Sequence, residues 1–83
     1  MRTIIIKINL ELDKSKLKFC SKAVYLASCY ESDVIVHDDN AEIDMKSILG
    51  LTTLLFYQDK EIKVTISGKD ENECAEALLF GLQ

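Results

Sequence analysis

Hydrophobic and polar residues alternate along this chain with two different periods, and the two periods separate predicted strands from predicted helices. The clearest two-residue alternation lies between residues 61 and 67, where aliphatic side chains are interrupted by Lys63 and Thr65. Side chains spaced by two residues share one face of a strand, so this segment predicts a strand with one buried face. Apolar runs of similar length predict three further strands, at residues 3–9, 32–37 and 41–45.

Spacings of three and four residues mark two predicted helices. Between residues 15 and 30, Leu17, Cys20, Val24 and Ala27 recur along one helical face. A shorter helix is predicted from residue 47 to about residue 56, because a serine precedes an apolar run there.

A third helix is predicted after Asp70, which together with Glu73 has the spacing of a capping box. Residues 38–40 and 68–69 are rich in Asp, Asn and Gly, which tolerate the backbone geometry of tight turns. The predicted order is therefore β-α-β-β-α-β-α. This order predicts a single α+β domain over residues 1–83, an open-faced sandwich in which three helices cover one face of a four-stranded antiparallel sheet.

Composition and charge exclude several classes of protein. The chain of 83 residues is 48% hydrophobic and 29% charged, which is typical of a globular domain and not of a disordered segment. Its net charge of −4 argues against binding to a nucleic-acid backbone. No segment reaches the roughly 18 apolar residues that a membrane span requires.

The three cysteines have no CxxC spacing, and their odd number favours reduced thiols in a cytoplasmic protein over a disulfide framework. The lone His37 has no cysteine at ligand spacing, so no metal site and no cofactor are expected. The sequence His37-Asp38-Asp39 is typical of a turn, and Cys20 is expected to be buried and unreactive.

Ser47 is the residue at which chemistry is most strongly indicated. As a predicted N-cap, its hydroxyl can accept a hydrogen bond from the first helical turn. The unpaired N–H groups and the helix dipole at the same place also favour a phosphate group. From the residues alone, a plain structural cap is the favoured interpretation.

Residues 46–51 (Lys-Ser-Ile-Leu-Gly-Leu), together with the order of elements, resemble the HPr family of the bacterial sugar phosphotransferase system. Residues 32–34 look like the family's second strand. Residues 66–78 are similar to its last strand, turn and acidic-capped helix. The resemblance covers nearly the whole chain and implies the same open-faced sandwich.

In that family a histidine on a loop at the start of the first helix accepts phosphate from Enzyme I, within the pattern Gly-Leu-His-Ala-Arg-Pro. The corresponding stretch, counted back from Ser32, is residues 14–19. The resemblance places Lys16 at the histidine, Lys18 at the arginine and Phe19 at the proline. A lysine ammonium is protonated near neutral pH and has no lone pair for phosphoryl attack, so we expect the phosphocarrier cycle to be absent.

Alternatives remain open for this region. Lys16 and Lys18 could hold an anion near the helix N-terminus, although we favour solvated loop residues. Ser15 could be the helix cap. His37, the only histidine, is predicted at the end of a strand and cannot replace the one that the family requires.

The resemblance also implies a regulatory role for Ser47. In many Gram-positive relatives the corresponding serine is phosphorylated by an ATP-dependent HPr kinase, and Lys46 could supply a counter-charge here. A retained structural cap is the equal alternative.

Relatives carry an exposed apolar docking patch at positions that correspond to Leu17, Ile48, Leu49 and Thr52, with Cys20 as a further candidate. Ile48 and Leu49 are adjacent on one short helix and cannot both face inward, so some outward apolar surface is expected. Such clusters mark protein contacts, although this one could also merely cover the edge of the core.

The sequence therefore predicts a cytoplasmic, non-catalytic regulatory or docking protein with Ser47 as its switch. Expected partners are phosphotransferase-system components or an HPr kinase. The alternatives are a phosphocarrier that uses a non-standard residue and a domain that binds a small anion at Lys16 and Lys18.

Overall fold

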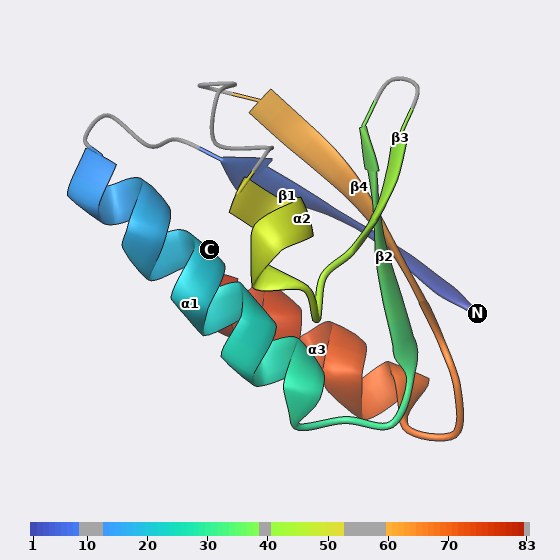
Figure 1. The fold of residues 1–83 in the computed structure, drawn as a ribbon. Coiled ribbons are helices and arrows are strands. Elements are labelled where there is room, and N and C mark those ends of the chain that lie inside the picture. The colour runs from blue at the N-terminus through green and yellow to red at the C-terminus, as the bar shows by residue number, and fades with distance from the viewer. Residues whose placement is uncertain (9–12, 39–40, 53–59, 83) are drawn as a thin grey trace.

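Four strands form one antiparallel sheet, and three helices cover one of its faces (Figure 1). The structure, a computed structural model, describes residues 1–8, 13–38, 41–52 and 60–82. Its elements are β1 (Arg2–Ile8), α1 (Asp13–Ser28), β2 (Asp33–Asp38), β3 (Ala41–Asp44), α2 (Ile48–Thr52), β4 (Lys60–Ser67) and α3 (Glu71–Leu82). This arrangement confirms the predicted fold class and order of elements.

The sheet has the strand order β1-β4-β2-β3, so the last strand of the chain lies between the first two. In this register Ile4 is opposite Val64, and Val64 is in turn opposite Val36. All three side chains lie on the face that the helices cover and are buried. The alternate residues, such as Lys63 and His37, therefore lie on the helix-free face.

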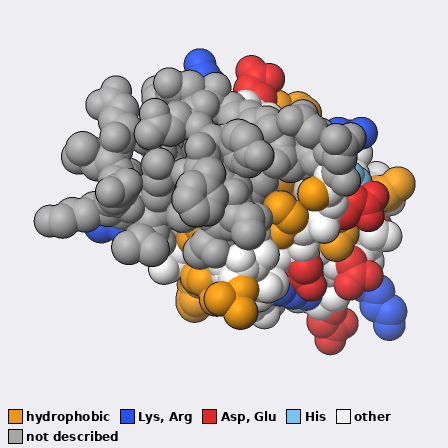
Figure 2. All heavy atoms as spheres, turned by 45° about the horizontal axis from the view of Figure 1, so that its top comes forward, with side chains coloured by type: hydrophobic (Ala, Val, Ile, Leu, Met, Phe, Trp, Pro, Cys, Tyr) orange, Lys and Arg blue, Asp and Glu red, His pale blue; other side chains and the backbone are white. Residues whose placement is uncertain are grey.

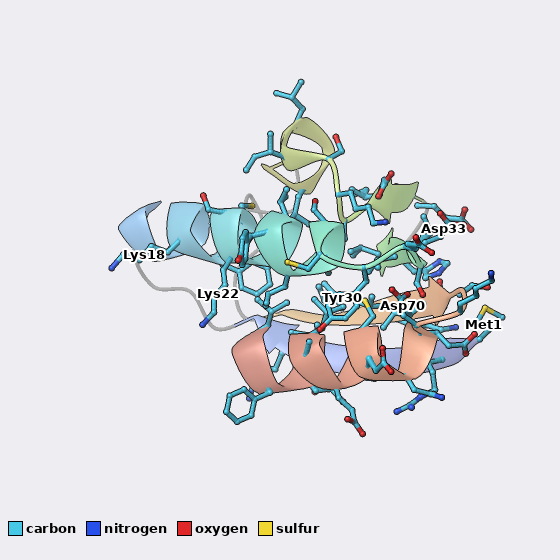
Figure 3. The ribbon with its side chains drawn as sticks, turned by 90° about the horizontal axis from the view of Figure 1, so that it is seen from below. Met1, Lys18, Lys22, Tyr30, Asp33 and Asp70 are labelled. Carbon is cyan, nitrogen blue, oxygen red and sulfur yellow. The ribbon has the colours of Figure 1, made fainter. Side chains whose placement is uncertain are left out.

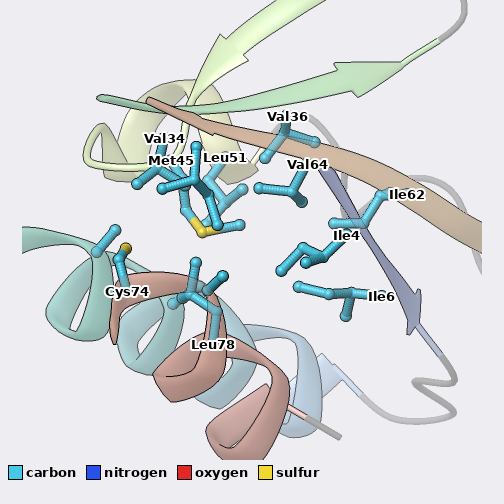
Figure 4. Packing of buried hydrophobic residues seen from close by; sticks show 14 of the residues in the cluster. Ile4, Ile6, Val34, Val36, Met45, Leu51, Ile62, Val64, Cys74 and Leu78 are labelled. Carbon is cyan, nitrogen blue, oxygen red and sulfur yellow. The ribbon is translucent and has the colours of Figure 1, made fainter. Parts of the chain in front are cut away.

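The core forms where the sheet meets the helices (Figure 4). Met45 and Leu51 contribute to it from either side of Ser47, and both are fully buried. Leu78 and Cys74 reach it from α3 and are also fully buried. The short helix α2 is thus fastened to the domain at both of its ends by buried apolar side chains.

Helix α1 begins and ends two residues earlier than the periodicity predicted, at Asp13 and Ser28. An aspartate in the first turn is favoured by the helix dipole, and the chain has no proline to interrupt the helix. At the other end, the N–H groups of Cys29 and Tyr30 donate to carbonyls only three residues back, which closes the helix with a tight turn. Ser15 is therefore the third residue of α1, and the interpretation of Ser15 as the cap is wrong.

Three predicted features lie partly outside the described residues. These are the end of the first strand at residue 9, the tip of the hairpin at residues 39–40 and the part of the short helix beyond Thr52. Among the described helices, none has both the length and the apolar character needed to cross a membrane.

Leu51→Ala should destabilise the domain, because it opens a cavity between α2 and the sheet. Leu51 is fully buried, and a truncation of this kind costs about 2–5 kcal/mol of unfolding free energy. Urea denaturation measures the loss. The matched control is Leu49→Ala in the same helix, where the side chain is 80% exposed and the change should stay within about 0.5 kcal/mol. Equal losses in the two variants would contradict this account of how α2 is held.

Candidate functional site

Ser47 is the N-cap of α2, as predicted. Its hydroxyl Oγ accepts a hydrogen bond from the N–H of Gly50 at 3.3 Å, and its carbonyl accepts the first helical bond from Leu51 at 3.0 Å. The turn before it is closed by Asp44, whose carbonyl accepts from the Ser47 N–H at 3.0 Å. The Ser47 side chain is nevertheless exposed, so its hydroxyl is accessible from solvent.

The backbone on both sides of Ser47 is fixed to the sheet. The N–H of Met45 donates to the carbonyl of Val34 at 2.9 Å, which extends the pairing of β2 and β3 up to the cap. On the other side, a Cβ on Gly50 would lie 3.1 Å from Cγ2 of Ile43, so α2 packs tightly on β3 at this point. Ser47 is therefore displayed at a defined position.

Lys46 does not act as a counter-charge for Ser47 in this structure. Its ammonium donates to the carbonyl of Tyr30 at 2.9 Å, just beyond the C-terminal end of α1. The negative end of the α1 dipole favours a cation at this place. Its backbone N–H donates to the Asp44 carboxylate at 2.9 Å, which adds a second tie within the same turn.

The residues after Ser47 present apolar surface. Ile48 is 44% exposed and Leu49 is 80% exposed, whereas Leu51 faces the core. In the space-filling view, hydrophobic side chains reach the surface at several places among charged ones (Figure 2). Leu17 and Thr52, the other expected members of the patch, lie in α1 and α2, but their side chains are outside the described part of the structure.

The segment that corresponds to the family's histidine loop is helical here. Lys16, Lys18 and Phe19 are the fourth, sixth and seventh residues of α1. The expectation that the two lysines are loop residues is therefore wrong. Lys18 lies beyond the first turn, where the helix dipole has little effect, and its side chain is exposed. Phe19 is half-buried against the core, and the side chain of Lys16 is not described.

Cys20, the expected inert thiol, is fully buried. Burial raises the pKa of its thiol, because the surroundings disfavour the thiolate. It is therefore not part of an accessible patch.

His37 lies on the helix-free face of the sheet, away from α1. Its ring nitrogen Nε2 is 2.9 Å from the hydroxyl of Thr65, and Nδ1 is 3.8 Å from the Glu42 carboxylate. These contacts join β2 to both of its neighbouring strands. Nowhere in the described residues do three or more His, Cys, Asp or Glu side chains gather as metal ligands would.

Asp70 forms a junction that sequence reasoning did not foresee. Its carboxylate accepts hydrogen bonds from the N–H of Glu31 at 2.9 Å, from the N–H of Ser32 at 3.0 Å and from the Ser32 hydroxyl. These bonds tie the start of α3 to the loop between α1 and β2 (Figure 3). The predicted capping box is wrong in detail, since Glu71, not Glu73, reaches back to a backbone N–H, that of Gly68.

The hydrogen bond from the Ser32 hydroxyl, followed by that from the Glu31 N–H, lowers the pKa of Asp70 below its ordinary value of 3.8. The carboxylate form is thus favoured in the folded protein. Ser32 is 1% exposed, so its hydroxyl would be buried without this partner.

A second feature missed at the sequence level is a shallow pocket on the outer side of α1, lined by Lys18, Ser21, Lys22 and Tyr25. Its residues follow helical spacing, which the sequence contained. The side chains could be assigned to one outward face only once the structure showed which face of α1 enters the core.

Comparison with known proteins relates residues 3–80 to the family described as the PTS HPr component phosphorylation site. The HPr-like protein Crh of Bacillus subtilis is 33% identical over 57 residues, which are 69% of this chain and 67% of Crh. The crystal structure of HPr-C-His from Thermoanaerobacter tengcongensis matches with a TM-score of 0.78 and 29% identity, covering 99% of this chain and 91% of that one.

The crystal structure of Crh from Bacillus subtilis, described as a catabolite repression protein that forms a dimer with a swapped domain, matches with a TM-score of 0.70. It is 28% identical, and the match covers 94% of this chain and 84% of that one.

Asp70→Asn should remove an acid-dependent part of the stability. Because the pKa of Asp70 is lowered on folding, its contribution is fully present above the ordinary value of 3.8 and is lost as the pH falls through the lower folded value. Thermal unfolding from about pH 6 to about pH 3 measures this. The wild type should exceed the variant in melting temperature at the upper end, and the gap should narrow as the pH falls.

Asp33→Asn is the matched control, since Asp33 is an exposed carboxylate at the start of β2. Its melting curve should follow that of the wild type across the whole range. A gap between wild type and Asp70→Asn that does not change with pH would refute the role of the Asp70 charge.

Proposed function

The chain belongs to the HPr family of the phosphotransferase system, and from this premise we propose that it is a regulatory or docking protein switched by phosphorylation of Ser47. Members of the family are phosphocarrier or regulatory proteins and not enzymes. Crh, a relative, is described as a catabolite repression protein. The choice between carrier and regulator depends on the residues of this chain.

The observation that carries the proposal is the display of Ser47. Its hydroxyl is exposed, aimed at the first turn of α2 and followed directly by the exposed Ile48 and Leu49. Phosphorylation would add about −1.5 to −2 charges beside this apolar surface. The backbone N–H groups of the first turn favour a charge of this sign, whereas Asp44 in the preceding turn opposes it. A partner would therefore contact an apolar surface in the unmodified protein, and the same surface with an anion at its edge in the phosphorylated protein.

The position of the only histidine supports a regulator over a carrier. His37 lies on the helix-free face of the sheet, and both of its ring nitrogens face groups of neighbouring strands. The position that resembles the carrier histidine holds Lys16 within α1, and a lysine ammonium is no phosphoacceptor near neutral pH. We propose that the phosphohistidine cycle is absent from this protein.

The proposed docking surface consists of Ile48 and Leu49 with Leu17 and Thr52. An apolar cluster beside a chargeable serine suits a protein partner whose binding depends on the phosphorylation state. Phosphotransferase-system components and an HPr kinase are the proposed partners, and the cytoplasm is the proposed location because the family acts there.

Incubation with ATP and an HPr kinase should add one phosphate to the protein. Intact mass spectrometry measures the addition, and peptide mapping locates it. Ser47→Ala should abolish it, because no hydroxyl is left at the cap. Ser21→Ala, which removes another exposed serine hydroxyl, is the matched control and should leave the reaction unchanged.

A parallel incubation with phosphoenolpyruvate and Enzyme I should add no phosphate. Acid-labile phosphate on the protein in that reaction would contradict the proposed loss of the carrier cycle. Phosphate that persists in Ser47→Ala after the kinase reaction would contradict Ser47 as the switch.

A further inference from the structure

The last turns of α3 expose a continuous apolar surface. Residues 77–82 (Ala-Leu-Leu-Phe-Gly-Leu) carry no polar side chain, and only Leu78 among them is fully buried. The Phe80 side chain is 92% exposed, and the remaining residues of the run are partly exposed. A single exposed apolar side chain is ordinary on a protein surface, but a contiguous group of this kind marks a contact with another molecule.

Two exposed carboxylates lie on the same side of α3, before the apolar run. Glu73 and Glu76 precede Phe80 by seven and four residues, so the three side chains share one helical face. Ala77 belongs to the same face, since it follows Glu73 by four residues. The opposite side of the helix carries Cys74 into the core. Glu73, Glu76, Ala77 and Phe80 thus form the outer face of α3, which is acidic in its first half and apolar in its second.

The cations that flank α3 do not neutralise the two carboxylates of this face. Arg2 of β1 donates to the side-chain oxygen of Asn72 at 2.9 Å. Lys22 of α1 lies at the far end of the helix, since its Cε is 3.8 Å from the position that a Cβ on Gly81 would take. Residues 71–82 contain no lysine or arginine. Among the described residues, no ion pair engages either carboxylate, so both are accessible to a positively charged partner.

The outer face of α3 is separate from the apolar surface that follows Ser47. Helix α1 lies between α2 and α3 and contacts both of them (Figure 3). The exposed Ile48 and Leu49 belong to α2, on the other side of α1. A molecule bound to α3 would therefore leave the surface next to Ser47 accessible.

We propose that the outer face of α3 binds a basic amphipathic helix of a protein partner. The face extends over about two helical turns, a length that a partner helix can follow with side chains at matching spacings. The apolar side chains of that helix cover Phe80 and Ala77, and its lysines or arginines lie opposite Glu73 and Glu76. A nucleic-acid backbone or an anionic lipid surface would be repelled by the same carboxylates. The proposal does not depend on the modification of Ser47.

A synthetic helical peptide is the probe that tests this proposal. The peptide has about 14 residues, with leucines on one helical face and lysines on the other. Fluorescence anisotropy of the labelled peptide with the full chain measures the dissociation constant, which we expect below about 1 mM at low ionic strength. A peptide of the same composition in shuffled order should bind at least about tenfold more weakly, because its leucines do not share one face. Equal binding of the two peptides would reduce the interaction to charge attraction and overturn the proposal.

NMR chemical-shift mapping locates the bound peptide, and the largest shifts should fall on α3. Shifts centred on α2 would place the peptide on the surface next to Ser47, which would overturn this proposal and leave the proposed function intact. Shifts on α3 that grow with protein concentration in the absence of peptide would assign the face to a second copy of the chain and would also refute it.

Phe80→Ala should raise the dissociation constant of the peptide at least about fivefold, because it removes the aromatic anchor of the face. The matched control is Tyr25→Ala, which removes a 68% exposed aromatic ring from α1 and should leave the dissociation constant within about twofold of the wild type. Circular dichroism checks that both variants are folded. Equal effects of the two substitutions would contradict the role of Phe80.

The double variant Glu73→Gln/Glu76→Gln should raise the dissociation constant at least about tenfold at low ionic strength, since it removes the charges opposite the lysines. Asp33→Asn/Glu61→Gln makes the same change in net charge at two exposed carboxylates of the sheet, and its effect should stay within about twofold. A similar loss of affinity in both double variants would reduce the effect to net charge and refute the proposed docking face.

Discussion

The burial of Met45 and Leu51 on either side of Ser47 is the constraint on which the candidate site depends. Full burial of one such side chain stabilises a fold by about 1.5–3 kcal/mol, and here two of them hold a helix of five residues. A helix this short has little stability of its own in water. The buried pair therefore determines that Ser47 is displayed as a cap and that Ile48 and Leu49 face solvent.

The same segment is coupled to the rest of the helical layer through backbone groups. Lys46 bonds to the Tyr30 carbonyl after α1, and Asp70 at the start of α3 bonds to the next two residues of that loop. The loop between α1 and β2 is thus held from two sides. Ser47 is adjacent to Lys46, which contacts this loop. A change at the Ser47 cap therefore lies close to both α1 and α2, and a partner that binds both helices would be in a position to sense it.

The extension of α1 through residues 16–19 changes what the first helix can do. A proline at position 19 would stop the helix there, because its ring excludes the preceding helical turn, but Phe19 allows the helix to continue back to Asp13. The lysines at positions 16 and 18 then lie along a helix and not around an anion at its start. Lys18 and Lys22 are exposed one turn apart on α1, while all charged residues of α3 are acidic, so a chain of net charge −4 still presents two neighbouring cations on one helix.

The sequence by itself determined the order of the elements, the fold class and the cap at Ser47, because period-two and helical spacing and capping residues act over a few neighbouring positions. It could not determine the strand order, in which β4 lies between β1 and β2, because that depends on which edges pair across the whole chain. The sequence predicted that the Asp70 carboxylate takes part in a local capping box. In the folded protein this carboxylate instead accepts a hydrogen bond from the N–H of Ser32, 38 positions away in the chain. It also showed the charges of α1 and α3 but not that they share one side of the molecule. The order of elements, the fold class and the cap follow from the spacing of neighbouring residues. The strand order and the hydrogen-bond partners of Asp70 depend on how distant segments pack together.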